Sequence, residues 1–157
     1  MTTIHLTEVT TSTPEQFIAG LTDFGPGRSK LFVNSHDDHL KVHDVGRDHA
    51  NVTEGSAGVW ERLYYDWSDP DHVVATTIDS SVWAGHSGHT YTFKRRIDGM
   101  TEIDAVIVRD GKNAKGLLLE FVLAIFGRRV LGKAFHNSIR AIEARNMSAT
   151  TTNRAEA

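Results

Sequence analysis

The sequence predicts a single α+β domain in which a curved antiparallel sheet packs against a long C-terminal helix. Three observations lead to this class. The chain has 157 residues, a common size for one domain. From about residue 40 to 110, short β-rich runs alternate with turn residues, and after Asn113 the hydrophobic period changes from two to about 3.6. We expect the domain to occupy residues 1–147 and residues 148–157 to form a disordered tail.

The N-terminal part of the chain predicts one strand and two short helices. Residues 3–9 are rich in β-branched side chains, which suits a strand. A helix then begins at Pro14, because Thr13 can cap it and Gln16 completes a capping box. A second short helix, from about residue 28 to 34, follows a Gly-Pro-Gly sequence.

The central part of the chain predicts an antiparallel meander. Strands are expected near residues 40–46, 50–55, 58–67, 72–79, 86–97 and 100–109, with turns at residues 46–48, 55–58, 68–71, 84–85 and 98–99. The Asp98-Gly99 step is the clearest hairpin signal, because both residues tolerate the positive φ of a tight turn.

The C-terminal helix has an apolar stripe that needs a partner. A helix from about Arg128 to Asn146 places on one face Leu131, Phe135, Ser138, Ile139 and Ile142. Residues 117–126 are apolar on nearly every side, and Gly127 is expected to form a kink or break. The helix can bury its stripe only by crossing the concave face of the preceding sheet.

Composition excludes several classes of function. The formal net charge of −3 gives no reason to expect nucleic acid as a partner. The chain has no cysteine, so disulfides, thiolate catalysis and a cysteine zinc site are excluded. The N-terminus lacks the pattern of a signal peptide, which predicts a cytoplasmic location. The longest apolar run, residues 116–127, is shorter than the roughly 20 residues of a span, so no stable membrane insertion is expected.

The order of elements resembles that of a known superfamily. Three segments carry the likeness: residues 59–67 (VWERLYYDW), 83–93 (WAGHSGHTYTF) and 109–113 (RDGKN). Over residues 3–146 the chain resembles the START-like (SRPBCC) helix-grip superfamily, in its polyketide cyclase/dehydrase and lipid-transport branch. The resemblance implies a seven-stranded sheet wrapped around the last helix, with a ligand cavity between them. It implies little about chemistry, because the superfamily includes carriers, sensors, cyclases and regulatory domains.

The strand near residues 86–97 provides two candidate polar ligand contacts. Ser87, His89, Tyr91 and Phe93 share the face that is expected to point inward. His89 and Tyr91 would then present polar atoms to an otherwise apolar cavity. The alternative is that both are ordinary hydrogen-bonded residues near the end of the sheet.

The next strand places Arg109 on its apolar face, in line with Ile103, Ala105 and Ile107. A buried arginine needs a partner. A ligand carboxylate is one candidate, and Glu120 on the following helix is the better one. The strand near residues 58–67 has aromatic side chains on both faces, so its inward face stays open, as does the direction of Trp83.

The candidate ligand-binding residues are expected to form a wall and a lid. The wall comprises His89, Tyr91, Phe93, Ile103, Ala105, Ile107, Arg109, Leu131 and Phe135, and the lid comprises Leu118, Val122 and Phe126. No metal site is expected, because the His- and Asp-rich residues 36–49 lie in a polar loop and hairpin where such side chains face water. No cofactor is expected either, since phosphate-loop and Rossmann glycine patterns are absent from the sequence, as is a hydrolase elbow.

Three functions are compatible with these features. The leading hypothesis is the binding or carriage of a small hydrophobic molecule, lipid-like or polyketide-like, by a monomer or weak homodimer. The second is a polyketide aromatase/cyclase or dehydratase in which His89 or Tyr91 moves protons and Arg109 stabilises an enolate. The third is a regulatory or protein-interaction domain that uses the apolar lid as a partner surface.

Overall fold

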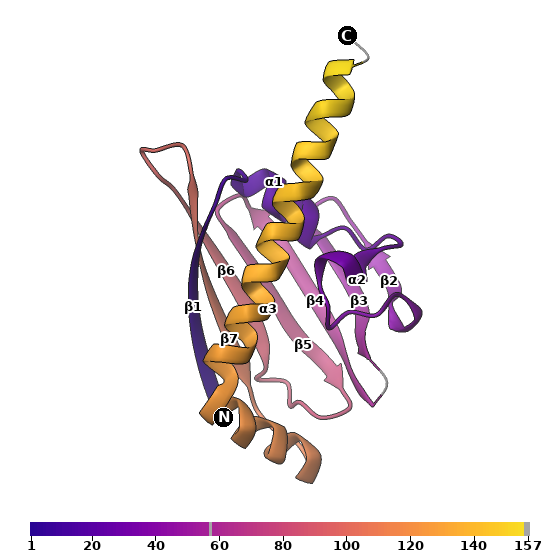
Figure 1. The fold of residues 1–157 in the computed structure, drawn as a ribbon. Helices are drawn as coiled ribbons and strands as arrows, with labels where there is room; N and C mark the ends of the chain where they lie inside the picture. Colours follow the sequence, from indigo (N-terminus) through magenta and orange to yellow (C-terminus); the bar gives the residue numbers. More distant parts are fainter. Residues whose placement is uncertain (57, 156–157) are drawn as a thin grey trace.

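A seven-stranded antiparallel sheet curves around one long helix in the computed structural model, which describes residues 1–56 and 58–155 (Figure 1). The strands are β1 (Thr2–Thr10), β2 (Lys41–Val45), β3 (His49–Ser56), β4 (Val59–Asp69), β5 (His72–Ser80), β6 (Gly88–Arg95) and β7 (Thr101–Arg109). Their order in the sheet is β1-β7-β6-β5-β4-β3-β2. The predicted α+β class with a helix-grip sheet is confirmed.

Local sequence explains the elements that follow β1. Helix α1 (Pro14–Leu21) begins as predicted, with the Thr13 side chain and Gln16 forming a reciprocal capping box. Helix α2 (Arg28–Leu31) is shorter than predicted, because the backbone at Phe32 is already extended. A 3-10 turn, η1 (Asp37–His39), then leads into β2.

The predicted turns lie between the antiparallel strands that they were expected to connect. Of the turn at residues 55–58, Ala57 lies outside the described residues. Gly55 and Gly58 there have φ values of 142° and 85°, and Gly99 in the β6–β7 turn has a φ of 83°. Glycine is the residue type that adopts such φ values without strain, so these positions fix the hairpins.

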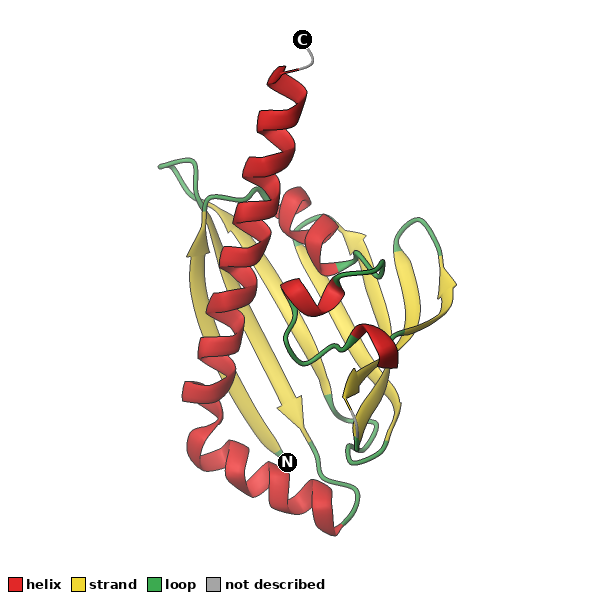
Figure 2. Ribbon diagram, turned by 45° about the vertical axis from the view of Figure 1, so that its right-hand side comes forward, coloured by secondary structure: helices red, strands yellow, loops and turns green. Residues whose placement is uncertain are grey.

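The long helix α3 (Ala114–Ala155) is continuous but bent (Figure 2). Its first part runs across one end of the sheet, and the remainder crosses the concave face. Gly127 permits a close approach, because a Cβ there would lie 2.5 Å from Cδ1 of Ile4. The predicted stripe is buried or half-buried from Leu131 to Ile142. Within the described residues, the structure has no helix with the length and hydropathy of a membrane span.

The helix extends through residues 148–155, where the sequence predicted a disordered tail. Hydroxyl side chains there donate to backbone carbonyls one turn earlier, as Thr150 does to Asn146 and Thr151 to Met147, both at 3.0 Å. These bonds keep polar side chains compatible with the helix. Residues 156–157 of the predicted tail lie outside the described residues.

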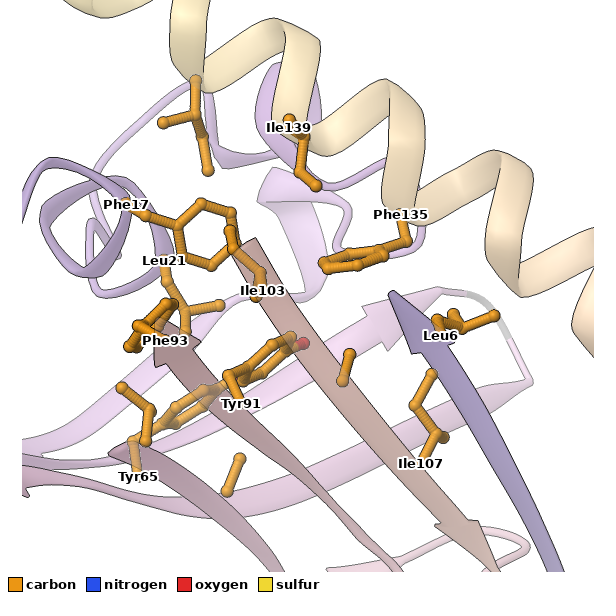
Figure 3. Packing of buried hydrophobic residues seen from close by; sticks show 14 of the residues in the cluster. Leu6, Phe17, Leu21, Tyr65, Tyr91, Phe93, Ile103, Ile107, Phe135 and Ile139 are labelled. Carbon is orange, nitrogen blue, oxygen red and sulfur yellow. The ribbon is translucent and has the colours of Figure 1, made fainter. Parts of the chain in front are cut away.

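The hydrophobic core fills the end of the sheet that α1 covers (Figure 3). Phe17 of α1 packs on Phe93 and Tyr91, with ring centroids 5.6 and 6.1 Å apart. Ile139 and Ile142 of α3 close this end from above and are fully buried. The space between sheet and helix toward the other end is less completely filled, and the candidate site lies there.

Candidate functional site

A cavity of about 190 Å³ lies between the concave face of the sheet and α3. Most of its wall is apolar: Leu21, Phe32, Val33, Val59, Leu63, Ala105, Ile107, Leu131, Ala134 and Phe135. Figure 3 shows Phe135 projecting from α3 toward the strand that carries Tyr91. The ring centroids of Phe135 and Tyr91 are 6.2 Å apart. Polar side chains interrupt this wall, and its charged side chains, Arg28, Glu54, Glu61 and Arg109, belong to two buried clusters.

The structure brings seven of the twelve predicted ligand-binding residues to the cavity wall. These are His89, Tyr91, Ala105, Ile107, Arg109, Leu131 and Phe135. Phe93 and Ile103 have the predicted inward direction but lie in the solid core, because α1 fills that end of the sheet with Phe17. The strand alternation was therefore interpreted correctly, while the extent of the cavity along the strands was overestimated.

The predicted lid does not lie over the cavity. Leu118, Val122 and Phe126 are 63%, 41% and 56% exposed. The bend of α3 explains the difference, because it directs the first part of the helix across the end of the sheet rather than over its concave face.

Strand β4 supplies an inward face that the sequence left open. Glu61, Leu63 and Tyr65 are buried on the cavity side, while Trp60 and Tyr64 on the other face are more than a third exposed. Trp83 is also buried, and its ring lies 5.3 Å from the guanidinium carbon of Arg109. The strand therefore contributes a carboxylate and a phenol to the cavity in addition to leucine.

The first polar cluster joins α2 to the sheet. Arg28 Nε donates to Oε2 of Glu54 at 2.7 Å, and its Nη1 donates to the backbone oxygens of Leu21 and Asp23 at 2.9 and 3.0 Å. Tyr65 and Ser35 also donate to the Glu54 carboxylate. Every strong acceptor and donor in this cluster is therefore engaged within the protein.

The charges of this cluster compensate one another. Burial alone would raise the pKa of Glu54, but the Arg28 charge and the bonds to the carboxylate hold that pKa below its ordinary value. Burial and the neighbouring Glu54 charge raise the pKa of Tyr65 well above its ordinary value. Glu54 is therefore ionised and Tyr65 neutral at pH 7, so the cluster contributes a salt bridge to the wall rather than a titrating acid.

The second cluster corrects the predicted partner of Arg109. Arg109 Nη1 donates to Oε1 of Glu61 at 3.1 Å, whereas Glu120 accepts from the backbone N–H of Gly111 at 2.9 Å and pairs with the N-terminal amino group. Glu120 therefore lies beside the end of β7, but its carboxylate is engaged by the Gly111 backbone and the N-terminal amino group rather than by Arg109. The Glu61 carboxylate also accepts from the Thr77 hydroxyl, so Arg109 is held in place by the sheet itself.

His89 also belongs to this cluster and is neutral. Arg109 Nη2 donates to its Nε2, so the single ring proton of His89 lies on Nδ1. Burial, followed by the charge of Arg109, lowers the pKa of His89 to about 3. At pH 7 the ring therefore presents an Nδ1–H donor.

Two polar atoms that β6 presents to the cavity have no hydrogen-bond partner among the described residues. Across residues 1–56 and 58–155, no group hydrogen-bonds to Nδ1 of His89 or to the Tyr91 hydroxyl. Among the described residues every fully buried side-chain nitrogen or oxygen is paired, so these two atoms retain accessible surface. Burial raises the pKa of Tyr91 to about 12, which keeps its hydroxyl a neutral donor and acceptor. Both residues line the cavity, and their rings lie 6.4 Å apart.

The histidine- and aspartate-rich surface does not assemble a metal centre. His49 contacts Asp44 at 3.3 Å and Asp48 at 3.0 Å near the β2–β3 turn. Nowhere in the described part of the chain do three or more His, Asp or Glu side chains converge as metal ligands. The chemistry of the site therefore has to be built from the cavity residues.

Three solved structures share this architecture at low sequence identity. A protein from Thermus thermophilus has a TM-score of 0.68 at 11% identity, with 94% of this chain and 99% of that chain covered. A START superfamily protein from Mycobacterium smegmatis has a TM-score of 0.64 at 8% identity, covering 91% and 95%. The chain has the START-like helix-grip fold.

The third helix-grip structure is the ZhuI aromatase/cyclase from Streptomyces sp. R1128, with a TM-score of 0.63 at 13% identity and coverage of 92% and 94%. No protein-family model matches the sequence, and a search among curated proteins finds no match. The predicted resemblance to the helix-grip superfamily is therefore confirmed at the level of the fold.

Sequence reasoning missed three charged cavity residues. Arg28, Glu54 and Glu61 were not among the predicted site residues, although all three line the cavity. A signal was present for Glu54, because Ala50, Val52 and Glu54 alternate on one face of β3 and a carboxylate in that row needs a buried partner. No comparable signal marked Arg28, which lies in a loop-flanked helix of only four residues.

Proposed function

We propose that this protein binds a compact hydrophobic molecule that carries an oxygen acceptor. The observation that carries the proposal is the combination of an apolar cavity with two unpartnered polar atoms, Nδ1 of His89 and the Tyr91 hydroxyl. A ligand carbonyl placed between them accepts from both, while its hydrocarbon part contacts Ile107 and Phe135. Carriage within the cytoplasm by a monomer or weak homodimer, as expected from the sequence, is part of this proposal.

The size of the cavity narrows the class of ligand. Its volume of about 190 Å³ is smaller than typical drug-sized sites of about 300–1,000 Å³. Two fused rings match this space better than a long acyl chain. Burial of such a ring system contributes about 25 cal/mol per Å² of apolar area, from which the cost of association is subtracted.

A matched pair of probes tests the polar contacts. 1-Tetralone and tetralin have the same fused rings, and only tetralone has a carbonyl. We expect isothermal titration calorimetry to give tighter binding of tetralone, by about 2- to 10-fold for each hydrogen bond that its carbonyl accepts. Replacing Tyr91 with Phe removes one donor, so it lowers the affinity for tetralone and leaves that for tetralin unchanged.

Failure of this experiment is clearly defined. Equal affinities of the wild-type protein for both probes would contradict the role of the polar pair. If neither probe binds, the proposal as a whole is contradicted. Phe93→Leu, a change in the core away from the cavity wall, is the control for general effects of altering an aromatic residue of β6.

A polyketide cyclase or dehydratase is the second candidate function. It is supported by the convergence of Arg109, His89 and Tyr91 on the cavity, since donors at a carbonyl stabilise a developing enolate. The low pKa of His89, about 3, makes this residue a poor proton acceptor at pH 7. This observation favours ligand binding over proton transfer by His89.

A further inference from the structure

The first part of α3 exposes a continuous apolar surface outside the cavity. We call it the apolar platform, and it comprises Leu117, Leu118, Phe121, Val122, Ile125 and Phe126. These side chains are between 41% and 64% exposed. Their spacing of one, three and four residues places them on one half of the helix circumference. Six large apolar side chains on one face are more than the isolated exposed residues of an ordinary protein surface.

The opposite side of this helix segment is anchored to the fold. Gly116 lies against the backbone of the loop that follows β5, since a Cβ there would be 2.1 Å from the carbonyl oxygen of Val82. Glu120 accepts from the Gly111 N–H, and Gly127 packs on Ile4 of β1. The platform is therefore the outer face of a helix segment whose inner face packs against the rest of the protein.

The charges around the platform are basic. Residues 112–133 include five lysine or arginine side chains and one carboxylate, in a chain whose formal net charge is −3. Arg128 and Arg129 lie one turn after Ile125, and no carboxylate in the described part of the chain pairs with either. The lone carboxylate, Glu120, is engaged on the inner side. The platform thus combines apolar side chains with uncompensated positive charge.

This charge pattern favours an anionic lipid surface over a second copy of the chain as the binding partner of the platform. A second copy packed antiparallel on it would bring Arg128 and Arg129 toward the partner's Lys115, which places like charges together. An anionic lipid surface instead attracts the basic end and accepts the apolar side chains between its headgroups. The remainder of the chain carries the excess of carboxylates, so the anionic surface attracts the platform in preference to the rest of the protein.

We propose that the apolar platform docks this protein reversibly on a bilayer surface that contains anionic lipids. The helix would lie parallel to the bilayer with its apolar side inserted at the headgroup level. The following turns of α3 contribute Leu131 and Ala134 to the cavity wall, so docking places the cavity beside the bilayer. This inference rests on the surface of α3 alone and holds whatever ligand the cavity binds.

Vesicle sedimentation with two lipid compositions tests the proposal. The wild-type protein is mixed with vesicles of phosphatidylcholine and phosphatidylglycerol, or with vesicles of phosphatidylcholine alone. We expect at least about 10-fold stronger binding to the anionic vesicles, because Arg128 and Arg129 each interact favourably with anionic lipid. The double change Phe121→Ser with Ile125→Ser is expected to weaken that binding by about 10-fold or more, because it removes apolar area from the inserted face.

Matched controls separate docking from general surface effects. Ile78→Ser with Ile97→Ser removes two exposed isoleucines elsewhere and is expected to leave vesicle binding unchanged. Arg128→Glu with Arg129→Glu is expected to abolish the preference for anionic vesicles. Lys41→Glu with Arg47→Glu changes the net charge equally at the exposed β2–β3 edge and is expected to preserve that preference.

Several outcomes would overturn the proposal. Equal binding to both kinds of vesicle would do so, as would binding that Phe121→Ser with Ile125→Ser leaves unaltered. A wild-type dimer in analytical ultracentrifugation that dissociates in this double variant would assign the platform to a second copy instead. All the changed side chains are exposed, and circular dichroism melting of each variant verifies that the fold is retained. If the Phe121→Ser, Ile125→Ser variant has a lower melting temperature than the wild-type protein, the Arg128→Glu, Arg129→Glu variant still tests whether the platform binds anionic vesicles.

Discussion

Replacing Arg28 with Met is expected to destabilise the protein by about 3–5 kcal/mol, the largest loss of stability that we predict for a single substitution. Arg28 is 2% exposed and is the only cation that contacts the Glu54 carboxylate among the described residues. Its loss leaves a buried carboxylate with neutral donors alone, and it leaves the carbonyls of Leu21 and Asp23 without their shared donor. Urea denaturation at pH 7 measures the change.

A double-mutant cycle distinguishes this mechanism from simple loss of packing. Because the Arg28 guanidinium also packs over the rings of Phe24 and Phe32, with its central carbon 4.6 and 4.7 Å from the ring centroids, some of the cost is a packing cost. Adding Glu54→Gln to the Met variant removes the uncompensated charge, so the double variant should be more stable than the sum of the two single effects by about 1–3 kcal/mol. Lys30→Met, an exposed change on the same helix, should alter stability by no more than about 0.5 kcal/mol. Additive effects in the cycle would show that charge compensation contributes nothing.

Acidification is expected to destabilise the protein through His89. The pKa of His89 is about 3 in the folded protein, below the ordinary value of 6.5 for this side chain. A histidine with a depressed folded-state pKa costs nothing above pH 6.5, and its cost grows as the pH falls from 6.5 toward 3, because only the unfolded chain takes up the proton. Between pH 7 and pH 5 the loss is about 2 kcal/mol.

The His89→Gln variant isolates this contribution. The glutamine amide oxygen can accept from Arg109 in place of Nε2 but does not titrate in this range. Unfolding free energies at pH 7 and pH 5 should therefore differ by about 2 kcal/mol less in the variant than in the wild-type protein. An identical pH dependence of the two proteins would mean that His89 has the same pKa in the folded and unfolded states, near 6.5, which would also restore it as a candidate proton carrier at pH 7.

Most of the sheet was predictable because period-two patterns and turn residues are local. The strands that carry Tyr91 and Ala105 were placed with the correct inward faces, since the inward row of each strand is more apolar than its outward row. The capping box at Thr13 also follows from neighbouring residues. In these segments, local chemistry and tertiary burial favour the same arrangement.

The polar clusters were harder to predict because they depend on pairing between distant segments. Arg28 and Glu54 are 26 residues apart, and Glu61 and Arg109 are 48 apart. Glu61 lies beside a register shift in the β4–β5 pairing, between Arg62 and Leu63. The resemblance alone does not specify that shift, and therefore Glu120, nearer in the chain, was the partner expected for Arg109.

The leading hypothesis placed the first part of α3 over the cavity as a lid, and only the third hypothesis used it as an exposed surface. An apolar run such as residues 117–126 predicts burial, because exposing it costs free energy in water. The fold buries only the inner side of this segment, through Gly116, Leu123 and Gly127, and leaves the outer side open. A sequence that conflicts with its own fold in this way often marks a functional surface.

Titration of 1-tetralone into the wild-type protein and into Ala134→Phe tests the central claim most directly, namely that the space between the sheet and α3 is a ligand site. Ala134 lines the cavity from α3, whereas Ala144 on the same helix is exposed and serves as the control position, Ala144→Phe. We predict stoichiometric binding by the wild-type and Ala144→Phe proteins. Ala134→Phe should lose at least about 10-fold in affinity at an unchanged or higher melting temperature, because the new ring fills the space. Unaltered binding by Ala134→Phe, or no binding by the wild-type protein, would contradict the claim.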